Sequence, residues 1–145
     1  MGVYTRFKKN PDGLRQLVEL LETTPRSRRQ KMIDVGMKED PEYTQKALQY
    51  VFQFEDILQL PDLELSELLS GVSPQLTAHA IFSTTPEIKA RFMMRASPRI
   101  AADLKDFLDN PNITPVQTSG GQLKMIEIAR KLEKKGVIKT KKMPS

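Results

Sequence analysis

The most regular feature of this sequence is a capping residue followed directly by proline, repeated along the chain. The side-chain oxygen of Ser, Thr or Asp can accept a hydrogen bond from a free N–H at a helix start. Proline at the first helical position lacks only a donor that would have no partner there. Apolar residues at helical spacing follow each pair, so the pairs predict helix starts. They are Thr24-Pro25, Asp40-Pro41, Ser73-Pro74, Thr85-Pro86 and Ser97-Pro98.

Apolar positions at helical spacing cover most of the chain and predict an all-α fold. In the first predicted helix, Leu14, Leu17, Val18 and Leu21 lie at i, i+3, i+4 and i+7. The β-branched residues are scattered and form no alternating strand pattern. Further helices are predicted from apolar positions within residues 32–35, 41–51, 65–69, 76–81, 88–93, 100–108 and 123–132, with Gly136 as the left-handed cap of the last.

The spacing of the helix starts predicts how the chain is organised. Ser73, Thr85 and Ser97 lie twelve residues apart, which allows a short helix and a tight corner, as in armadillo-like or compact orthogonal bundles. A change of composition near residues 50–60 predicts a helical unit over 11–50, a connector over 51–60 and a helical bundle over 61–138. The turn-rich segment 110–121 is predicted to be a loop. Residues 1–10 and the basic tail 139–145 are predicted to be disordered.

The composition fits a soluble protein of the cytoplasm. Hydrophobic residues make up 39% of the 145 residues and charged residues 28%, and there is no cysteine for disulfides or thiolate metal sites. No window approaches the ~18 consecutive apolar residues of a membrane span. The first residues contain no apolar signal segment. We therefore expect a cytoplasmic location.

The net charge of +5 suggests that the chain could bind an anionic partner, such as nucleic acid. Arg28 and Arg29 near a helix start would favour phosphates, and a DNA-binding helical domain predicts binding that weakens steeply with salt. However, the charged residues from Glu55 to Glu67 are all acidic, and this segment interrupts a continuous basic face. We therefore expect no nucleic-acid partner. The basic clusters are Arg26, Arg28, Arg29 and Lys31, and then Lys131, Lys134, Lys135, Lys139, Lys141 and Lys142.

Candidate catalytic groups are few. His79 is the only histidine and lies in a predicted helix, where packing or a surface position is the usual role. No His, Asp or Glu cluster has metal-ligand spacing. Ser119-Gly120-Gly121 lacks the preceding strand of a phosphate-binding loop. Asp103 and Asp106 form an i, i+3 pair of the kind that surface helices carry routinely. We expect no enzyme activity, no cofactor and no metal.

The segment from Tyr50 to Ile57 carries the most specific motif. Phe52 and Phe54 do not fit one face of a helix but fit a bent connector that inserts both rings into neighbouring cores. The segment resembles the Met-Phe-x-Phe motif of the FliG family of flagellar motor switch proteins, with Val51 in place of Met. Other segments resemble that family in the same order, over about residues 11 to 138. They are Gly13-Leu14 with Val18 to Leu21, Lys38 to Glu42, Ala96 to Asp106, Pro115-Val116, and Arg130 to Gly136.

The resemblance implies a fold and a function. It implies an armadillo-like three-helix unit, joined by an aromatic hinge of Val51, Phe52, Gln53 and Phe54 to a compact C-terminal helical subdomain. A charged helix of that subdomain would contact the cytoplasmic loop of the stator protein MotA and transmit torque. The hinge would serve direction switching. FliM and a neighbouring FliG are the other implied partners, at the cytoplasmic face of the inner membrane.

Carried over position by position, Arg99 and Asp106 fall on two of the family's torque charges. They are seven residues apart, so one helix face would present both, about 10 Å from each other. Three other positions depart from the family, since they carry Phe82, Phe107 and Gln117 where a charge is expected. Lys105, with Lys89 and Arg91, is a candidate for replacement charge. If Phe107 packs inward instead, the register shifts by one residue.

These departures leave a second hypothesis open. A FliG-like adaptor without torque function would use the same fold to bind a different protein, with Phe82 and Phe107 in a partly apolar contact site. The amino-terminal and middle domains of the family are not in this sequence, which fits either a fragment or a short paralogue.

Overall fold

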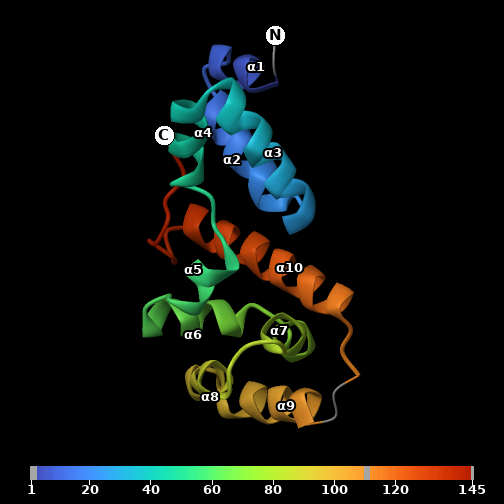
Figure 1. Cartoon of the computed structure of the whole chain (residues 1–145). Helices are drawn as coiled ribbons and strands as arrows, with labels where there is room; N and C mark the ends of the chain where they lie inside the picture. Colours follow the sequence, from blue (N-terminus) through green and yellow to red (C-terminus); the bar gives the residue numbers. More distant parts are fainter. Residues whose placement is uncertain (1–2, 110–111, 145) are drawn as a thin grey trace. The chain divides into compact units, whose positions relative to one another are not determined.

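A computed structural model describes residues 3–109 and 112–144 of the chain, and ten α-helices make up the regular structure of these residues (Figure 1). The helices fall into two compact units. Unit 1 consists of the described residues of Met1–Phe52 and Lys141–Ser145, and unit 2 of those of Gln53–Thr140. The helices are α1 (Val3–Lys9), α2 (Gly13–Thr23), α3 (Arg26–Glu39), α4 (Pro41–Leu48), α5 (Phe54–Leu58), α6 (Asp62–Ser70), α7 (Pro74–Ile81), α8 (Pro86–Arg95), α9 (Pro98–Asp109) and α10 (Pro115–Lys134).

Unit 1 is built around the apolar face of α2. The predicted positions Leu17, Val18 and Leu21 are fully buried, because helical periodicity turns them all towards α1 and α4. Helix α3 packs on α4, and only Gly36 of α3 is buried. The core cluster consists of Tyr4, Leu17, Val18, Leu21, Ala47 and Val51.

The ends of the chain differ from the predicted disorder. Residues 3–9 form α1, which packs on α2, and Tyr4 is 3% exposed in the core of unit 1. Its hydroxyl donates to the carbonyl of Met32. The tail returns to the same unit, where Met143 packs against that core. Each segment thus contributes an apolar side chain to the packing of unit 1. Met1, Gly2 and Ser145 lie outside the described residues.

Unit 2 is arranged around α7, which packs on α10 and on α9 (Figure 1). Helix α8 contacts α6 and α9, and α10 also contacts α5 and α6. Gly121 is buried where α10 meets α7, since a Cβ at this position would lie 2.9 Å from the amide nitrogen of Ala80 and 3.1 Å from the carbonyl oxygen of Leu76. A residue without a side chain is needed for this approach.

The predicted loop over residues 110–121 is wrong from Thr114 onward. Thr114 caps α10: its hydroxyl accepts from the N–H of Gln117, whose side chain accepts in return from the N–H of Thr114. Thr114-Pro115 is thus another pair of a capping residue and proline, of the same kind as the pairs that predict the other helix starts. This helix start was missed in the sequence because Gly120 and Gly121 are typical of turns. In the structure, Gly121 instead allows α10 to pack closely on α7. Asn110 and Pro111 lie outside the described residues.

Most of the predicted caps are present. The side chains of Asp40, Ser73 and Thr85 accept from backbone N–H groups at the starts of α4, α7 and α8. Ser97 accepts from the N–H of Ile100 at 3.4 Å. Thr24 differs, because its hydroxyl donates to the carbonyl of Leu20 at the end of α2, and Pro25 takes the capping position of α3.

Candidate functional site

Helix α9 presents a charged face to solvent. Leu104 is fully buried and Ile100 and Leu108 are half-buried, whereas Arg99, Asp106 and their neighbours on the opposite face are exposed. This separation follows from the helical period of the apolar positions. An exposed cation and anion therefore lie two turns apart on one helix, about 10 Å from each other.

Lys105, the candidate replacement charge, is paired within its own helix. Its ammonium lies 2.8 Å from a carboxylate oxygen of Asp109, one turn further on. The hydrogen bond to Asp109 raises the pKa of Lys105, with a smaller contribution from the charge of Asp106. Arg99 forms no ion pair with any residue that the structure describes. The exposed face of α9 thus carries one cation already neutralised and one that is not.

The three altered positions have separate local environments. Phe82 is half-buried, and the ammonium of Lys89 lies 5.4 Å from the centre of its ring. Phe107 is 39% exposed on α9, so it does not pack fully inward. Gln117 belongs to the cap of α10 described above. Phe107 alone among the three adds apolar surface to the charged face of α9.

Arg91, another candidate for replacement charge, forms hydrogen bonds within unit 2. Its guanidinium donates to the carbonyls of Leu58 and Leu60 and to the carboxylate of Asp62 at 3.0 Å. It thereby fixes the connection from α5 to α6 on α8. The sequence gives no sign of this arrangement, because the carbonyls that Arg91 binds are about thirty positions earlier in the chain.

The predicted hinge contains the boundary between the units, which falls between Phe52 and Gln53. Val51 and Phe52 are fully buried, Phe54 is 8% exposed and Gln53 is exposed. The second half of the predicted connector 51–60 is not extended chain, because Phe54 starts helix α5. The N–H of Gln53 donates to the carboxylate of Asp56 at 2.8 Å and so caps this short helix.

No catalytic or metal centre is found among the residues of the described ranges. They contain no group of three His, Asp or Glu side chains placed to hold a metal ion. His79 is half-buried in α7, and its Cβ faces Gly121 of α10, so it belongs to the packing of these helices. Ser119 and its two following glycines are helical and form no phosphate-binding loop. Over the described residues, no helix is long and apolar enough to cross a membrane.

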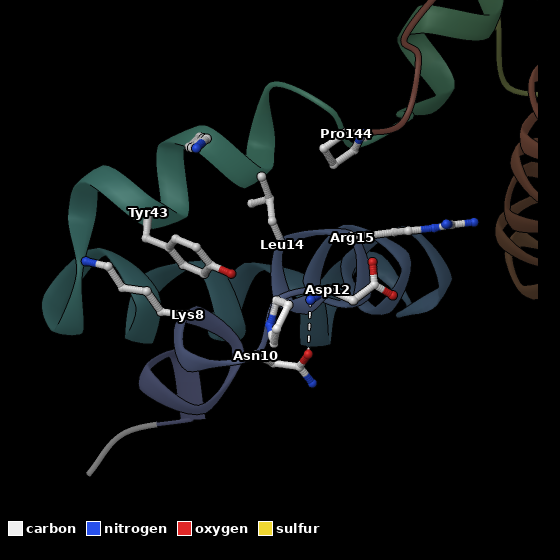
Figure 2. A pocket seen from close by; sticks show the side chains of 9 residues that line it. Lys8, Asn10, Asp12, Leu14, Arg15, Tyr43 and Pro144 are labelled. Atoms are coloured by element: carbon white, nitrogen blue, oxygen red, sulfur yellow. Dashed lines mark hydrogen bonds between the residues drawn. The ribbon is translucent and has the colours of Figure 1, made fainter.

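Unit 1 has a polar pocket of about 270 Å³ beside the start of α2 (Figure 2). Tyr43 and Leu14 line it, while Arg15 extends away from Tyr43. Two of its three cations are compensated, since Lys8 pairs with Asp40 at 2.8 Å and Arg15 lies 3.6 Å from Glu19. We assign no ligand to this pocket.

Comparison with known proteins identifies relatives over nearly the whole chain. The sequence is 31% identical over 140 residues to the flagellar motor switch protein FliG of Thermotoga maritima, which covers 94% of this chain and 41% of the relative. It is 30% identical over 129 residues to FliG of Borreliella burgdorferi, covering 87% of this chain and 37% of the relative. The chain therefore spans about two fifths of the length of these relatives.

Solved structures show the same fold. The crystal structure of FliG residues 86–343 from H. pylori matches with a TM-score of 0.66 and 22% identity, over 91% of this chain and 63% of that one. The full-length FliG of Aquifex aeolicus matches with a TM-score of 0.54 and 26% identity, over 88% and 40%. Both the all-α fold and the family inferred from the sequence are confirmed. Because the family profile of the FliG C-terminal domain also matches residues 37–139, this chain belongs to the FliG C-terminal domain family.

Proposed function

We propose that the chain is a component of the flagellar rotor and switch, whose helix α9 contacts the stator to transmit torque. Its relatives are flagellar motor switch proteins, and a motor component without enzyme activity agrees with that family. The stator protein MotA, through its cytoplasmic loop, is the proposed partner of α9. FliM and a neighbouring FliG are the proposed partners within the ring, and the site of action is the cytoplasmic face of the inner membrane.

The observation that supports torque transmission is the placement of Arg99 and Asp106 on the exposed face of α9. A rigid helix holds these opposite charges at a fixed spacing, so a partner with the complementary pair can meet both at once. Exposed charge pairs guide encounter and register more than they add affinity. They are also screened by salt. Brief, repeated contacts of this kind suit a moving interface.

The direct test is the charge reversal Asp106→Lys in the source cell. We expect swimming to be impaired or lost, because the reversed charge repels the partner group that Asp106 attracts. The matched control is Glu67→Lys, which makes the same change at an exposed position of α6. Swimming in soft agar and thermal unfolding of the purified variants are the measurements. Normal swimming of Asp106→Lys, with the protein folded, would contradict torque transmission through α9.

The second candidate function is an adaptor that binds a different protein with the same fold. It is favoured by Phe107, an exposed aromatic residue at a position where the family is expected to carry a charge. Deletion of the gene separates the two functions. If the chain is a rotor component, deletion should abolish swimming. If it is an adaptor outside torque generation, deletion should leave swimming unchanged. In the adaptor case, Phe82 and Phe107 are the first residues to substitute.

A further inference from the structure

The excess positive charge of the chain lies entirely in unit 1. The sequence of unit 1 contains twelve Lys and Arg residues and seven Asp and Glu residues, whereas unit 2 contains eleven of each kind. The net charge of +5 therefore belongs to the unit that does not contain α9. A charge of this sign attracts an anionic partner, and the partner would meet unit 1.

Helix α3 presents part of this charge as a straight stripe. Four of its residues lie at i, i+3, i+7 and i+10, so they follow one side of the helix over about 15 Å. These residues, called the α3 stripe below, are Arg28, Lys31, Val35 and Lys38. All four are exposed, and Gly36 is the only buried residue of α3. The α3 stripe thus holds three cations on a solvent-facing side of unit 1.

The three cations of the α3 stripe form no ion pair with any residue in the described part of the chain. Asp34, the acid beside the stripe, accepts a hydrogen bond from the amide of Gln30 at 3.0 Å. Glu39, at the end of α3, accepts from the N–H of Tyr4 at 3.3 Å. The acids of this helix therefore do not neutralise the stripe.

Other acids of unit 1 are engaged away from the α3 stripe. Glu22 of α2 is only 4% exposed, and its carboxylate accepts from the N–H of Phe52 at 2.7 Å. Asp40 pairs with Lys8, as described above. The positive charge of the stripe is consequently left to the solvent and to whatever binds there.

The stability of α3 does not explain these cations. Arg28 belongs to the first turn of α3, which contains no acid, and a cation is unfavourable near the positive end of a helix. Arg28 and Lys31 are three residues apart, at a spacing where like charges on a helix repel each other. Removal of these charges should leave the fold intact or stabilise it slightly. A partner therefore accounts for the stripe better than the fold does.

The chemistry of the α3 stripe favours the surface of an anionic bilayer over a protein. A stable protein interface buries about 800 Å² of each partner around an apolar core, from which Lys is depleted. The stripe contains two Lys residues, and its one apolar side chain is Val35, which is 47% exposed. An anionic bilayer needs no apolar core on its partner, because each Lys or Arg near its surface is attracted on its own. Its headgroups also move laterally and can match any spacing of cations.

We propose that the α3 stripe binds the headgroups of anionic phospholipids at a membrane surface. Arg28 can bind one phosphate through two N–H groups at once, while Lys31 and Lys38 act as point charges. The contact is peripheral and mainly electrostatic, because a single exposed Val gives little apolar surface to bury. This binding goes beyond the proposed function, in which α9 of unit 2 contacts another motor protein, and it does not depend on it.

Cosedimentation of the full chain with lipid vesicles tests the proposal. Vesicles of equal parts phosphatidylglycerol and phosphatidylcholine should retain the wild type at low salt, whereas vesicles of phosphatidylcholine alone should not. Each of Arg28→Gln, Lys31→Gln and Lys38→Gln should weaken binding about fivefold, and the three together about 100-fold. Salt at about 0.5 M should release the wild type, because it screens exposed charges.

A triple variant of unit 2 is the matched control, since it removes the same number of exposed charges. It should bind the anionic vesicles as the wild type does, and thermal unfolding should show that both triple variants are folded. The control combines Arg99→Gln, Lys135→Gln and Lys139→Gln.

Three outcomes would overturn the proposal. The first is a wild type that the anionic vesicles do not retain at low salt. The second is an equal loss of binding in both triple variants, which would assign the effect to total charge instead of the α3 stripe. The third is retention of duplex DNA at a salt concentration that releases the vesicles, which would assign the stripe to nucleic acid. Since none of these measurements involves swimming, the proposed function is tested separately.

Discussion

Units 1 and 2 each have a glycine where helices come into close contact, but the groups around the two glycines differ. A Cβ on Gly36 of α3 would meet side chains, the hydroxyl of Thr44 and the ring of Tyr4, each at 2.5 Å. A Cβ on Gly121 of α10 would meet the backbone of α7. Side chains can turn aside, and Tyr4 lies on a seven-residue helix at the end of the unit. The backbone inside a packed helix cannot move in this way, so we expect a Cβ to be tolerated less well at Gly121 than at Gly36.

The largest expected effect concerns the aromatic residues at the junction. Truncating Phe54, which is 8% exposed at the start of unit 2, or Phe52, which is fully buried, should cost about 3–5 kcal/mol in the free energy of unfolding. Urea denaturation followed by circular dichroism measures this cost. With Phe54→Ala, NMR resonances of α2 should keep their wild-type shifts at urea concentrations that unfold α7 and α10. A cost below about 1 kcal/mol would show that the rings are not part of a packed core.

A set of alanine substitutions compares the two glycines directly. Gly121→Ala should cost about 1–3 kcal/mol, because α10 must move away from the backbone of α7. Gly120→Ala, at the preceding position with open space around it, should stabilise the protein by up to about 1 kcal/mol through helix propensity. Gly36→Ala should cost less than Gly121→Ala, since α1 can shift and the same propensity gain applies. Thermal unfolding of the three variants ranks their stabilities. A cost for Gly36→Ala equal to or larger than that for Gly121→Ala would contradict the expected difference between the two glycines.

The smallest expected effect is a pH dependence in unit 1. The hydrogen bond from Lys8, together with that from the N–H of Tyr43, lowers the pKa of Asp40 from its ordinary value of 3.8. The unfolded state therefore binds the proton more readily, and this stabilisation is present above pH 3.8 and is lost as pH falls through the lower folded pKa. Asp40→Asn keeps the helix cap but loses the ion pair. The free energy of unfolding of this variant, measured by urea denaturation, should be slightly lower than that of wild type near pH 6. The difference should shrink near pH 3. A deficit that does not change with pH would show that the ion pair with Lys8 does not stabilise the protein.

Local signals in the sequence predicted every helix except α1 and α5 among the described residues, and the exposed face of α9. A cap acts within three residues of its own position, and the outward placement of Arg99 and Asp106 follows from helical period alone. What the sequence did not predict depends on distant partners. Gly121 is typical of a turn in sequence, but in the structure α7 packs against it, and α1 packs on α2 with Tyr4 in the core of unit 1. The hydrogen bonds of Arg91 and Glu22 join residues about thirty positions apart, which no local pattern encodes.

The return of the tail to unit 1 has a consequence for synthesis on the ribosome. Unit 2 is one continuous segment of the chain, whereas unit 1 is discontinuous and includes Met143. Although most of unit 1 is translated first, the segment that completes its core leaves the exit tunnel only after all of unit 2 has been made. Domains usually fold in the order in which they emerge. Here the first unit to start folding is the last to finish.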